Sequence, residues 1–287
     1  MDRKTVSVNG IELSVADGGD PDASALLLLH GWPESARAWS KLEPLIGGDF
    51  RLLIPDQRGF GQSERPQGVA SYAMPQLVAD AVGLLDWAGV ATVGVVAHDF
   101  GGAVAWAMGA MYPERISRMI IMASPHPMRL RRAAIENPDQ LRRSFYVWLL
   151  HSESGRALLA ADGYRRLADW AFGESAGVTP QDRQAYIDEW SQPGAFEAMA
   201  NWYRANYRPQ WFDPAVPMEL PPTKVPVLYI HPERDQAFVP EAATGSGEWV
   251  DAEFEEQIMV GTSHWMIHEK PQEVAAAVGE WLATGRS

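Results

Sequence analysis

The sequence predicts an α/β fold, with a mostly parallel sheet, helices on both faces of it and an inserted helical cap. Three observations lead to this prediction. Short apolar runs typical of buried strands alternate with stretches of helical spacing. A hairpin pattern precedes them, with Asn9-Gly10 between two short strand-like runs. One interval of roughly 100 residues breaks the alternation and carries no clear strand pattern, which is too long for a structureless connection.

The elements are expected in a regular order along the chain. Strands are predicted at residues 5–8, 11–15, 25–29, 51–54, 93–97, 119–122, 225–230 and 253–259. Helices are predicted at residues 35–46, 76–87, 103–111 and 271–283. The inner strands are continuous apolar runs because a parallel sheet is covered on both faces.

The interval from Ser124 to Lys224 is helix-like in patches and rich in tryptophan. Prolines mark the return of the chain to the sheet: Pro214, Pro217, Pro221 and Pro222. We therefore expect residues 1–124 to form the first part of an α/β core. Residues 125–217 would form a helical cap, and residues 218–287 the second part of the core.

Composition excludes several kinds of function. The 287 residues carry a formal net charge of −13, which argues against nucleic acid or an anionic membrane as a partner. The absence of cysteine excludes disulfides, thiolate metal sites and cysteine nucleophiles. We see no secretory signal at the start and no apolar run long enough to span a bilayer. We expect a cytoplasmic protein.

Polar residues follow several of the predicted strands, at the sheet edge where open α/β folds place their active sites. Asp99 stands between a strand and a helix, Asp235 follows a later strand, and His264 follows the last. Aspartate is also among the best helix N-caps, so a capping role is the alternative for Asp99. Glu233, two residues before Asp235, competes with it as the second acid.

Four motifs stand in order along the chain: HGWP, DQRGFGQS, AHDFGG and GTSHW. With them the sequence resembles the α/β-hydrolases over nearly its whole length. The nucleophile motif of that superfamily reads G-x-S-x-G. Here Ala97-His98-Asp99-Phe100-Gly101 has aspartate in place of serine, which resembles the epoxide hydrolases and haloalkane dehalogenases. The resemblance implies Asp99 as nucleophile, His264 as base and Asp235, favoured over Glu233, as the acid of the triad.

An aspartate nucleophile suits displacement at a saturated carbon because a carboxylate is already ionised at neutral pH. The product would be an alkyl ester on Asp99. Water activated by His264 would hydrolyse this ester, with Asp235 orienting the imidazole. By position in the motifs, the backbone N–H groups of Trp32 and Phe100 would bind the oxyanion. No cofactor is expected.

Opening an epoxide also needs a proton donor for the alkoxide, and a phenol is a suitable acid. The segment ANWYRAN resembles the epoxide hydrolase segment that carries a ring-opening tyrosine, which implies Tyr203 as the first acid. Tyr146 in RSFYVW matches the second family tyrosine best. The fallback candidates for this second acid are Tyr164, Tyr186 and Tyr207.

A dehalogenase would place tryptophan or arginine after the nucleophile, where this chain has Phe100. Trp32, where many dehalogenases carry a halide-binding asparagine, is expected to line the pocket with its ring. The expected function is therefore hydrolysis of a small apolar epoxide, aromatic epoxides included, by water. The alternatives are a haloalkane or haloacid dehalogenase with the same nucleophile and a non-catalytic ligand receptor of this fold. A serine esterase would need serine at position 99.

The remaining histidines are interpreted as structural. His30 and His98 are expected to pack or form hydrogen bonds. His264 and His268 are four residues apart, a spacing that can bind metal, but no third ligand is evident nearby. No metal site is expected.

Overall fold

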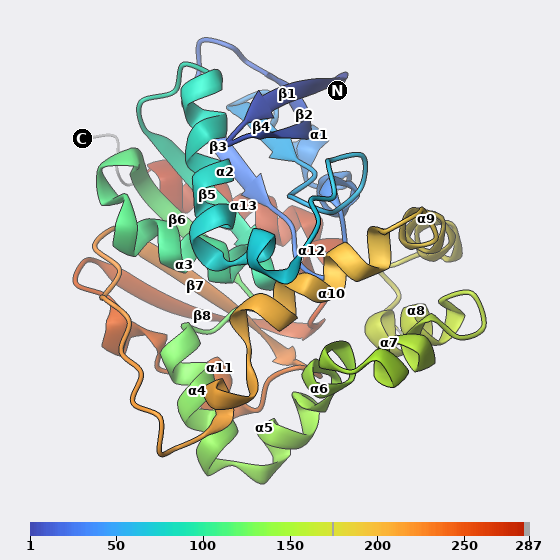
Figure 1. Ribbon diagram of the computed structural model, residues 1–287. Coiled ribbons are helices and arrows are strands. Elements are labelled where there is room, and N and C mark those ends of the chain that lie inside the picture. Colours follow the sequence, from blue (N-terminus) through green and yellow to red (C-terminus); the bar gives the residue numbers. More distant parts are fainter. Residues whose placement is uncertain (174, 284–287) are drawn as a thin grey trace.

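The computed structural model describes residues 1–173 and 175–283, which form a central sheet covered by helices (Figure 1). The strands lie in the order β1-β2-β4-β3-β5-β6-β7-β8. They are β1 (Arg3–Val8), β2 (Ile11–Gly19), β3 (Ala25–Leu29), β4 (Arg51–Pro55), β5 (Val93–His98), β6 (Ile116–Met122), β7 (Val227–Arg234) and β8 (Phe254–Ser263). Pairing is antiparallel from β1 to β2 and from β2 to β4, and parallel elsewhere. The predicted mostly parallel sheet is confirmed.

The two faces of the sheet carry separate apolar layers. Leu27 and Leu29 of β3 pack into one layer, whereas Leu26 and Leu28 pack into the other. This alternation is why a continuous apolar run suits an inner parallel strand. The first layer contains α2 (Met74–Trp87) and α3 (Phe100–Met111), and the second contains α13 (Pro271–Ala283), so helices cover both faces.

One predicted helix differs from the structure. Residues 35–46 form two short pieces, η1 (Ala36–Trp39) and α1 (Glu43–Ile46), instead of one helix. Pro44 lies in the first turn of α1. Because proline has no N–H to donate, it is tolerated at a helix start and not in the middle of a longer helix.

Between β6 and β7 the chain forms a series of helices, which lie along the bottom and the right of Figure 1. The helices are α4 (Pro127–Glu136), α5 (Pro138–Arg143), α6 (Phe145–His151), α7 (Glu153–Ala160), α8 (Arg165–Phe172), α9 (Pro180–Trp190), α10 (Ala195–Asn206) and η4 (Pro209–Phe212). We refer to these helices as the cap. The remaining short helices are η2 (Val69–Tyr72), η3 (Pro113–Arg115), α11 (Pro240–Ala243), η5 (Ser246–Trp249) and α12 (Met266–Glu269).

Two tryptophans of the cap join it to the core. The indole N–H of Trp190 donates to the backbone carbonyl of Pro33 at 2.7 Å. The indole N–H of Trp202 donates to the backbone carbonyl of Arg58 at 2.9 Å. Both rings are almost fully buried. Buried tryptophan combines a large apolar surface with one N–H that needs a partner, so it suits a joint between two layers.

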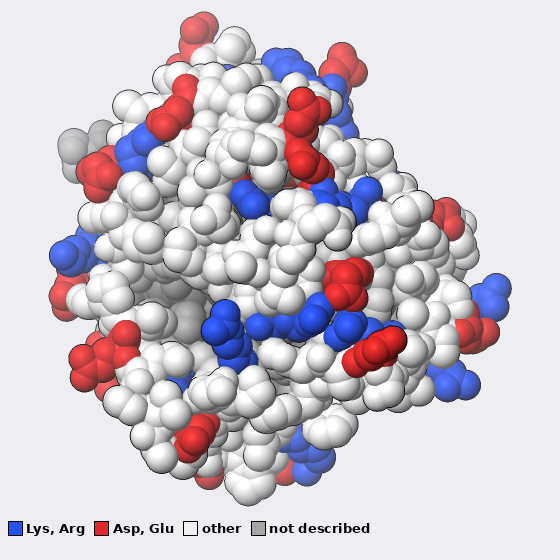
Figure 2. Space-filling view, viewed as in Figure 1, with Lys and Arg blue, Asp and Glu red and all other residues white. Residues whose placement is uncertain are grey.

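The surface carries charges of both signs. On the face in Figure 2, acidic and basic side chains are interspersed, so the net charge of −13 does not form one uniform patch there. Among the helices of the described residues, none is both long enough and apolar enough to cross a membrane.

Candidate active site

Asp99 lies at the turn between β5 and α3, with a backbone φ of 49° and ψ of −122°. This left-handed conformation is unfavourable for a residue with a side chain and costs on the order of 1–3 kcal/mol. Within the described residues, the Asp99 carboxylate makes no hydrogen bond to the first turn of α3. It accepts a hydrogen bond from the backbone N–H of Trp32 at 2.8 Å instead. The geometry therefore does not favour the N-cap alternative.

The turn at Asp99 needs small neighbours. A Cβ on Gly31 would lie 2.5 Å from the Asp99 Cβ, and a Cβ on Gly101 would lie 2.3 Å from the carbonyl oxygen of Leu29. Both distances are far below van der Waals contact, so only glycine fits. The glycines of the HGWP and AHDFGG motifs thus let the carboxylate side chain project beyond the sheet edge.

His264 lies between two carboxylates. Its Nδ1 is 3.1 Å from Asp235 Oδ1, and its Nε2 is 3.4 Å from Asp99 Oδ2. The three residues follow β5, β7 and β8, whose carboxyl ends meet at one edge of the sheet. Asp99 precedes Asp235 and His264 by more than 100 positions in the chain, and this parallel order brings it beside them.

The carboxylates set the charge of the imidazole. Burial alone would lower the pKa of His264, but the charges of Asp235 and Asp99 and their hydrogen bonds raise it to about 10. Burial alone would raise the pKa of Asp99. The hydrogen bond and charge of His264, the charge of His98 and the N–H of Trp32 lower it instead. At neutral pH the three side chains therefore form a carboxylate–imidazolium–carboxylate row.

Tyr146 of α6 and Tyr203 of α10 face this row from the cap. Their hydroxyl groups are hydrogen bonded to each other at 2.9 Å. The ring of Trp32 stacks on Tyr146 at 5.9 Å and meets Tyr203 edge-on at 5.4 Å. Burial, with a further contribution from the negative charge of Asp99, raises the pKa of both tyrosines. Both phenols are therefore protonated at neutral pH.

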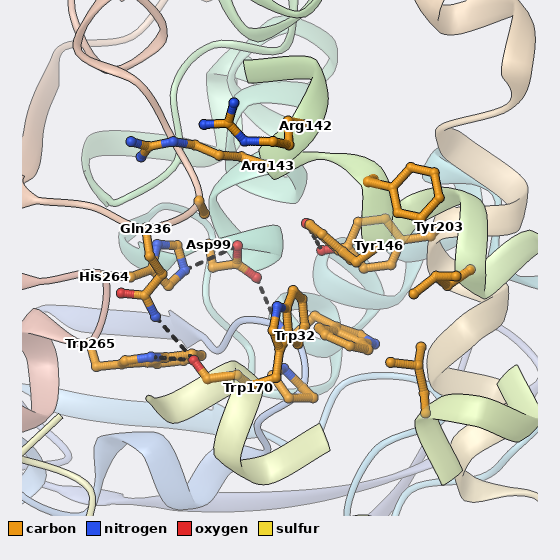
Figure 3. Close-up of a pocket in the computed structure, with 16 residues that line it drawn as sticks. Trp32, Asp99, Arg142, Arg143, Tyr146, Trp170, Tyr203, Gln236, His264 and Trp265 are labelled. Carbon is orange, nitrogen blue, oxygen red and sulfur yellow. Dashed lines mark hydrogen bonds and ion pairs between the residues drawn. The ribbon is translucent and has the colours of Figure 1, made fainter. Parts of the chain in front are cut away.

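A cavity of about 520 Å³ separates the core residues from the cap residues. Figure 3 shows Asp99 and His264 on one side of it and Tyr146 and Tyr203 on the other. The rest of the wall is largely apolar, and includes Trp32, Leu149, Leu159, Trp170 and Trp265. Its size lies within the range of small-molecule sites.

Two predicted site residues lie just outside this cavity. Asp235 is behind His264, and Phe100 lines a smaller adjoining cavity of about 40 Å³ that also reaches Asp99. Phe100 is the first residue of α3, where backbone N–H groups have no partner within the helix. Glu233, the competing acid, is exposed and accepts the N–H of Gly261 at 2.8 Å.

The fallback tyrosines lie in different surroundings. Tyr207 lines the smaller cavity together with Asp99. Tyr164 packs against the ring of Phe196, at a centroid distance of 5.3 Å. The Tyr186 hydroxyl donates to Glu34 at 3.2 Å. None of these three is among the residues that line the 520 Å³ cavity in the described chain.

The sequence reasoning missed Glu34, which is fully buried beneath the site. Its carboxylate lies 2.5 Å from His268 Nε2 and 3.3 Å from His98 Nδ1. Burial opposes its ionisation, but the charge and hydrogen bond of His268, followed by those of His98, hold the pKa of Glu34 well below its usual range. The glutamate directly after HGWP was the available signal, since a glutamate in an otherwise buried turn needs partners.

The other histidines make specific hydrogen bonds. His98 Nε2 bonds the backbone carbonyl of His264 at 2.9 Å, and His30 Nε2 accepts the N–H of Gln57 at 3.1 Å. Among the described residues, no group of three or more histidine, cysteine, aspartate or glutamate side chains could hold a metal ion.

The chain is similar in sequence to a known family and to known proteins. Residues 24–271 match the family described as alpha/beta hydrolase fold. The AB hydrolase superfamily protein YfhM of Bacillus subtilis is 37% identical over 205 residues, which cover 70% of this chain and 71% of the relative. Epoxide hydrolase A of Mycobacterium tuberculosis is 30% identical over an alignment that covers 97% of this chain and 96% of the relative.

Two solved structures of epoxide hydrolases are also similar to this chain. The Bacillus megaterium epoxide hydrolase, in complex with an inhibitor, superimposes with a TM-score of 0.88 at 27% identity, covering 98% of this chain and 100% of the other. An epoxide hydrolase from metagenomes of hot environments has a TM-score of 0.87 at 31% identity, covering 98% of both chains.

Proposed function

This chain belongs to the epoxide hydrolase family of the α/β-hydrolase superfamily, and from that premise we propose that it hydrolyses an apolar epoxide to a vicinal diol through an ester on Asp99. The observation that carries the proposal is the wall of the 520 Å³ cavity. A carboxylate and an imidazole on one side face two phenols on the other, with an apolar wall between them. Nucleophile, base and acid are the three groups that this reaction requires.

In the first half-reaction an oxygen of Asp99 attacks one epoxide carbon, and the bond from that carbon to the ring oxygen breaks. The ring oxygen takes the proton of Tyr146 or Tyr203, leaving a tyrosinate hydrogen bonded to the other phenol. The product is a hydroxyalkyl ester on Asp99. Because the pKa of both tyrosines is raised, each phenol is protonated at neutral pH and has a proton to give as the alkoxide develops.

Formation of the ester also prepares the base. The Asp99 charge helps to raise the pKa of His264 to about 10, and esterification removes that charge. The pKa of His264 then falls, and the imidazolium gives its proton to the tyrosinate. The neutral imidazole takes a proton from water as the water oxygen attacks the ester carbonyl. Collapse of the oxyanion breaks the bond from the Asp99 carbonyl carbon to the diol oxygen, and this oxygen takes the proton of the new Asp99 carboxyl group. The diol leaves, and Asp99 is again a carboxylate beside the His264 imidazolium.

The side chains around Asp99 favour epoxide opening over dehalogenation as the reaction. Phe100, next to the nucleophile, packs edge-on against the rings of Trp202 at 4.9 Å and Tyr203 at 5.0 Å. Its side chain has no N–H to offer a departing halide. The paired phenols supply instead the transferable proton that an alkoxide needs and a halide does not.

A single turnover in water enriched in heavy oxygen tests the proposal. With enzyme in excess over styrene oxide, the diol should be mostly unlabelled, because its new oxygen comes from Asp99. The label should appear in the peptide that contains Asp99, detected by mass spectrometry. Under multiple turnovers the label should then pass into later diol molecules. Labelled diol in the first turnover, with none at Asp99, would mean that water attacks the epoxide directly.

A further inference from the structure

The predicted acid, Asp235, belongs to a loop at residues 235–239, which we call the acid loop. Its Oδ1 accepts hydrogen bonds from the N–H groups of Ala237 at 2.7 Å and Phe238 at 3.2 Å. The same oxygen lies 3.1 Å from Nδ1 of His264. The direction of the carboxylate therefore depends on the backbone of the acid loop. A group that holds this backbone also holds Asp235 against the imidazole.

Helix α5 of the cap binds the acid loop with two side chains. Nη1 of Arg143 donates to the carbonyl of Asp235 at 2.6 Å and to that of Phe238 at 2.8 Å. Nε2 of Gln140 donates to the carbonyl of Ala237 at 3.0 Å, and its Oε1 accepts the N–H of Val239 at 2.9 Å. Gln140 is fully buried, so breaking these bonds would leave polar groups unpaired at a cost of about 1–3 kcal/mol each.

Helix α8 of the cap makes a second contact with the same region. The carbonyl of Ala171 accepts hydrogen bonds from Gln236 Nε2 at 3.1 Å and from Trp265 Nε1 at 2.8 Å. In Figure 3 the dashed lines from Gln236 and Trp265 meet at this oxygen. Gln236 follows the acid and Trp265 follows the histidine. The cap therefore touches the chain directly beside both members of the pair.

We propose that Arg143 and Gln140 are positioning residues that hold Asp235 in line with His264, so that docking of the cap organises the ester-hydrolysing half of the site. The inference rests on the proposed function. It implies that the cap serves both half-reactions, by its phenols in the first and by α5 in the second. Attack by Asp99 on the epoxide does not use Asp235. Loss of the Arg143 contacts should therefore affect the second half-reaction selectively.

The test compares Arg143→Met with Arg132→Met. Methionine keeps an apolar side chain along the cavity wall and removes both hydrogen bonds to the acid loop. Arg132 is the matched control, because its guanidinium joins cap helix α4 to Glu248 of η5 by two bonds of 2.8 Å. Rapid mixing with styrene oxide, followed by mass spectrometry of the intact protein, gives the rates at which the ester forms and decays.

In Arg143→Met we expect ester decay to slow roughly 10- to 100-fold, because a small displacement of a catalytic group has effects of that size. Ester formation should change by less than about 2-fold, since Asp99 and the phenols are untouched. Arg132→Met should leave both rates unchanged. Equal slowing of formation and decay in Arg143→Met, or no slowing of decay, would overturn the proposal.

A titration of His264 by nuclear magnetic resonance, without substrate, gives a second readout. The pKa of His264 is raised to about 10 chiefly by Asp235. Misalignment of that carboxylate should lower the pKa by about 1 in Arg143→Met and not in Arg132→Met. An unchanged pKa would contradict the positioning role. If wild-type protein formed no ester with any epoxide, the proposed function would fail, and this titration would still decide the role of Arg143.

If Arg143→Met does not fold, Arg143→Lys replaces it in both measurements. An ammonium can reach one of the two carbonyls, so ester decay should slow by a smaller factor in the same direction. Decay at the wild-type rate in Arg143→Lys, together with an unchanged His264 pKa, would also overturn the proposal.

Discussion

The core and the cap contribute opposite kinds of chemistry to the same cavity. The core side chains are ions: Asp99 and Asp235 are carboxylates, and together they hold His264 as a cation. The cap side chains are neutral acids, Tyr146 and Tyr203, whose hydroxyl groups are bonded to each other. The core groups follow strands of one sheet, whereas the phenols project from two separate helices.

This difference indicates how one cavity would support the two successive half-reactions of the proposed function. Ions can be held close together only where opposite charges and N–H groups compensate burial, as the row at the sheet edge does. Neutral phenols tolerate the apolar surroundings of the cap and keep their protons there. In the proposed reaction the phenols of the cap deliver the proton to the opening ring, while the ionised groups of the core, with Asp235 held in line by α5, hydrolyse the ester. Substitutions on either side should separate the two steps.

The largest effect is expected from His264→Gln, which removes the base from the core. Hydrolysis of the ester should slow roughly 10⁴-fold, because general base catalysis is lost. Attack by Asp99 needs no base, so ester should form and persist. Mass spectrometry of intact protein mixed with styrene oxide should show a stable adduct. Fast turnover with no adduct would remove His264 from the reaction.

A paired substitution separates the two candidate acids of the core. Asp235→Asn should slow ester hydrolysis roughly 10³-fold, since the amide no longer stabilises the imidazolium. Glu233→Gln is the control, because Glu233 is exposed and bonds the backbone of Gly261. It should leave the rate within about 2-fold of wild type. The opposite ranking, measured by decay of the ester, would make Glu233 the functional acid.

On the cap side, the double change Tyr146→Phe and Tyr203→Phe should slow ester formation roughly 10²- to 10³-fold, because the alkoxide loses its proton donors. Each single change should have a smaller effect, since one phenol remains. Thermal unfolding tests whether the fold is intact. Near-normal ester formation in a folded double variant would direct the search to Tyr207, which lines the adjoining cavity.

The smallest effect concerns stability against pH. The folded-state pKa of His264 lies at about 10, above the value near 6.5 expected when unfolded. Its contribution to the free energy of unfolding is therefore complete below about pH 6.5 and is lost as pH rises towards 10. The slope should not exceed about 1.4 kcal/mol per pH unit. Urea denaturation across this range should show a steeper loss in wild type than in His264→Gln, and equal slopes would contradict the charged row.

The strands of the core and the candidate residues beside them could be predicted from the sequence, because the patterns that indicate them are short and local. Each buried parallel strand is a short apolar run, and each candidate group stands within a few residues of a strand end. The run at 25–29 coincides with β3, and Asp99, Asp235 and His264 then meet because parallel strands end at one edge. Their catalytic roles stay predictions, but their placement at one edge of the sheet followed from their positions directly after predicted strands.

In the cap, local pattern was a weaker guide. The sequence showed that this interval is rich in tryptophan but not what each ring does: Trp190 and Trp202 bond backbone carbonyls of the core, whereas Trp170 lines the cavity. The resemblance to known enzymes selected Tyr203 and Tyr146. No periodicity could have shown that their hydroxyl groups meet, because they lie on helices whose relative placement depends on packing.

The sequence by itself determined the class of fold, the succession of strands and helices along the chain and the few residues that stand at strand ends. It could do so because apolar periodicity and turn chemistry act over short distances along the chain. Only the tertiary structure decided which partners those residues obtained: Glu34 between His98 and His268, and Arg143 on the backbone of the acid loop. Charges and hydrogen bonds are set by distances in space: folding of the core brings Glu34 between His98 and His268, and packing of the cap on the core brings Arg143 to the acid loop.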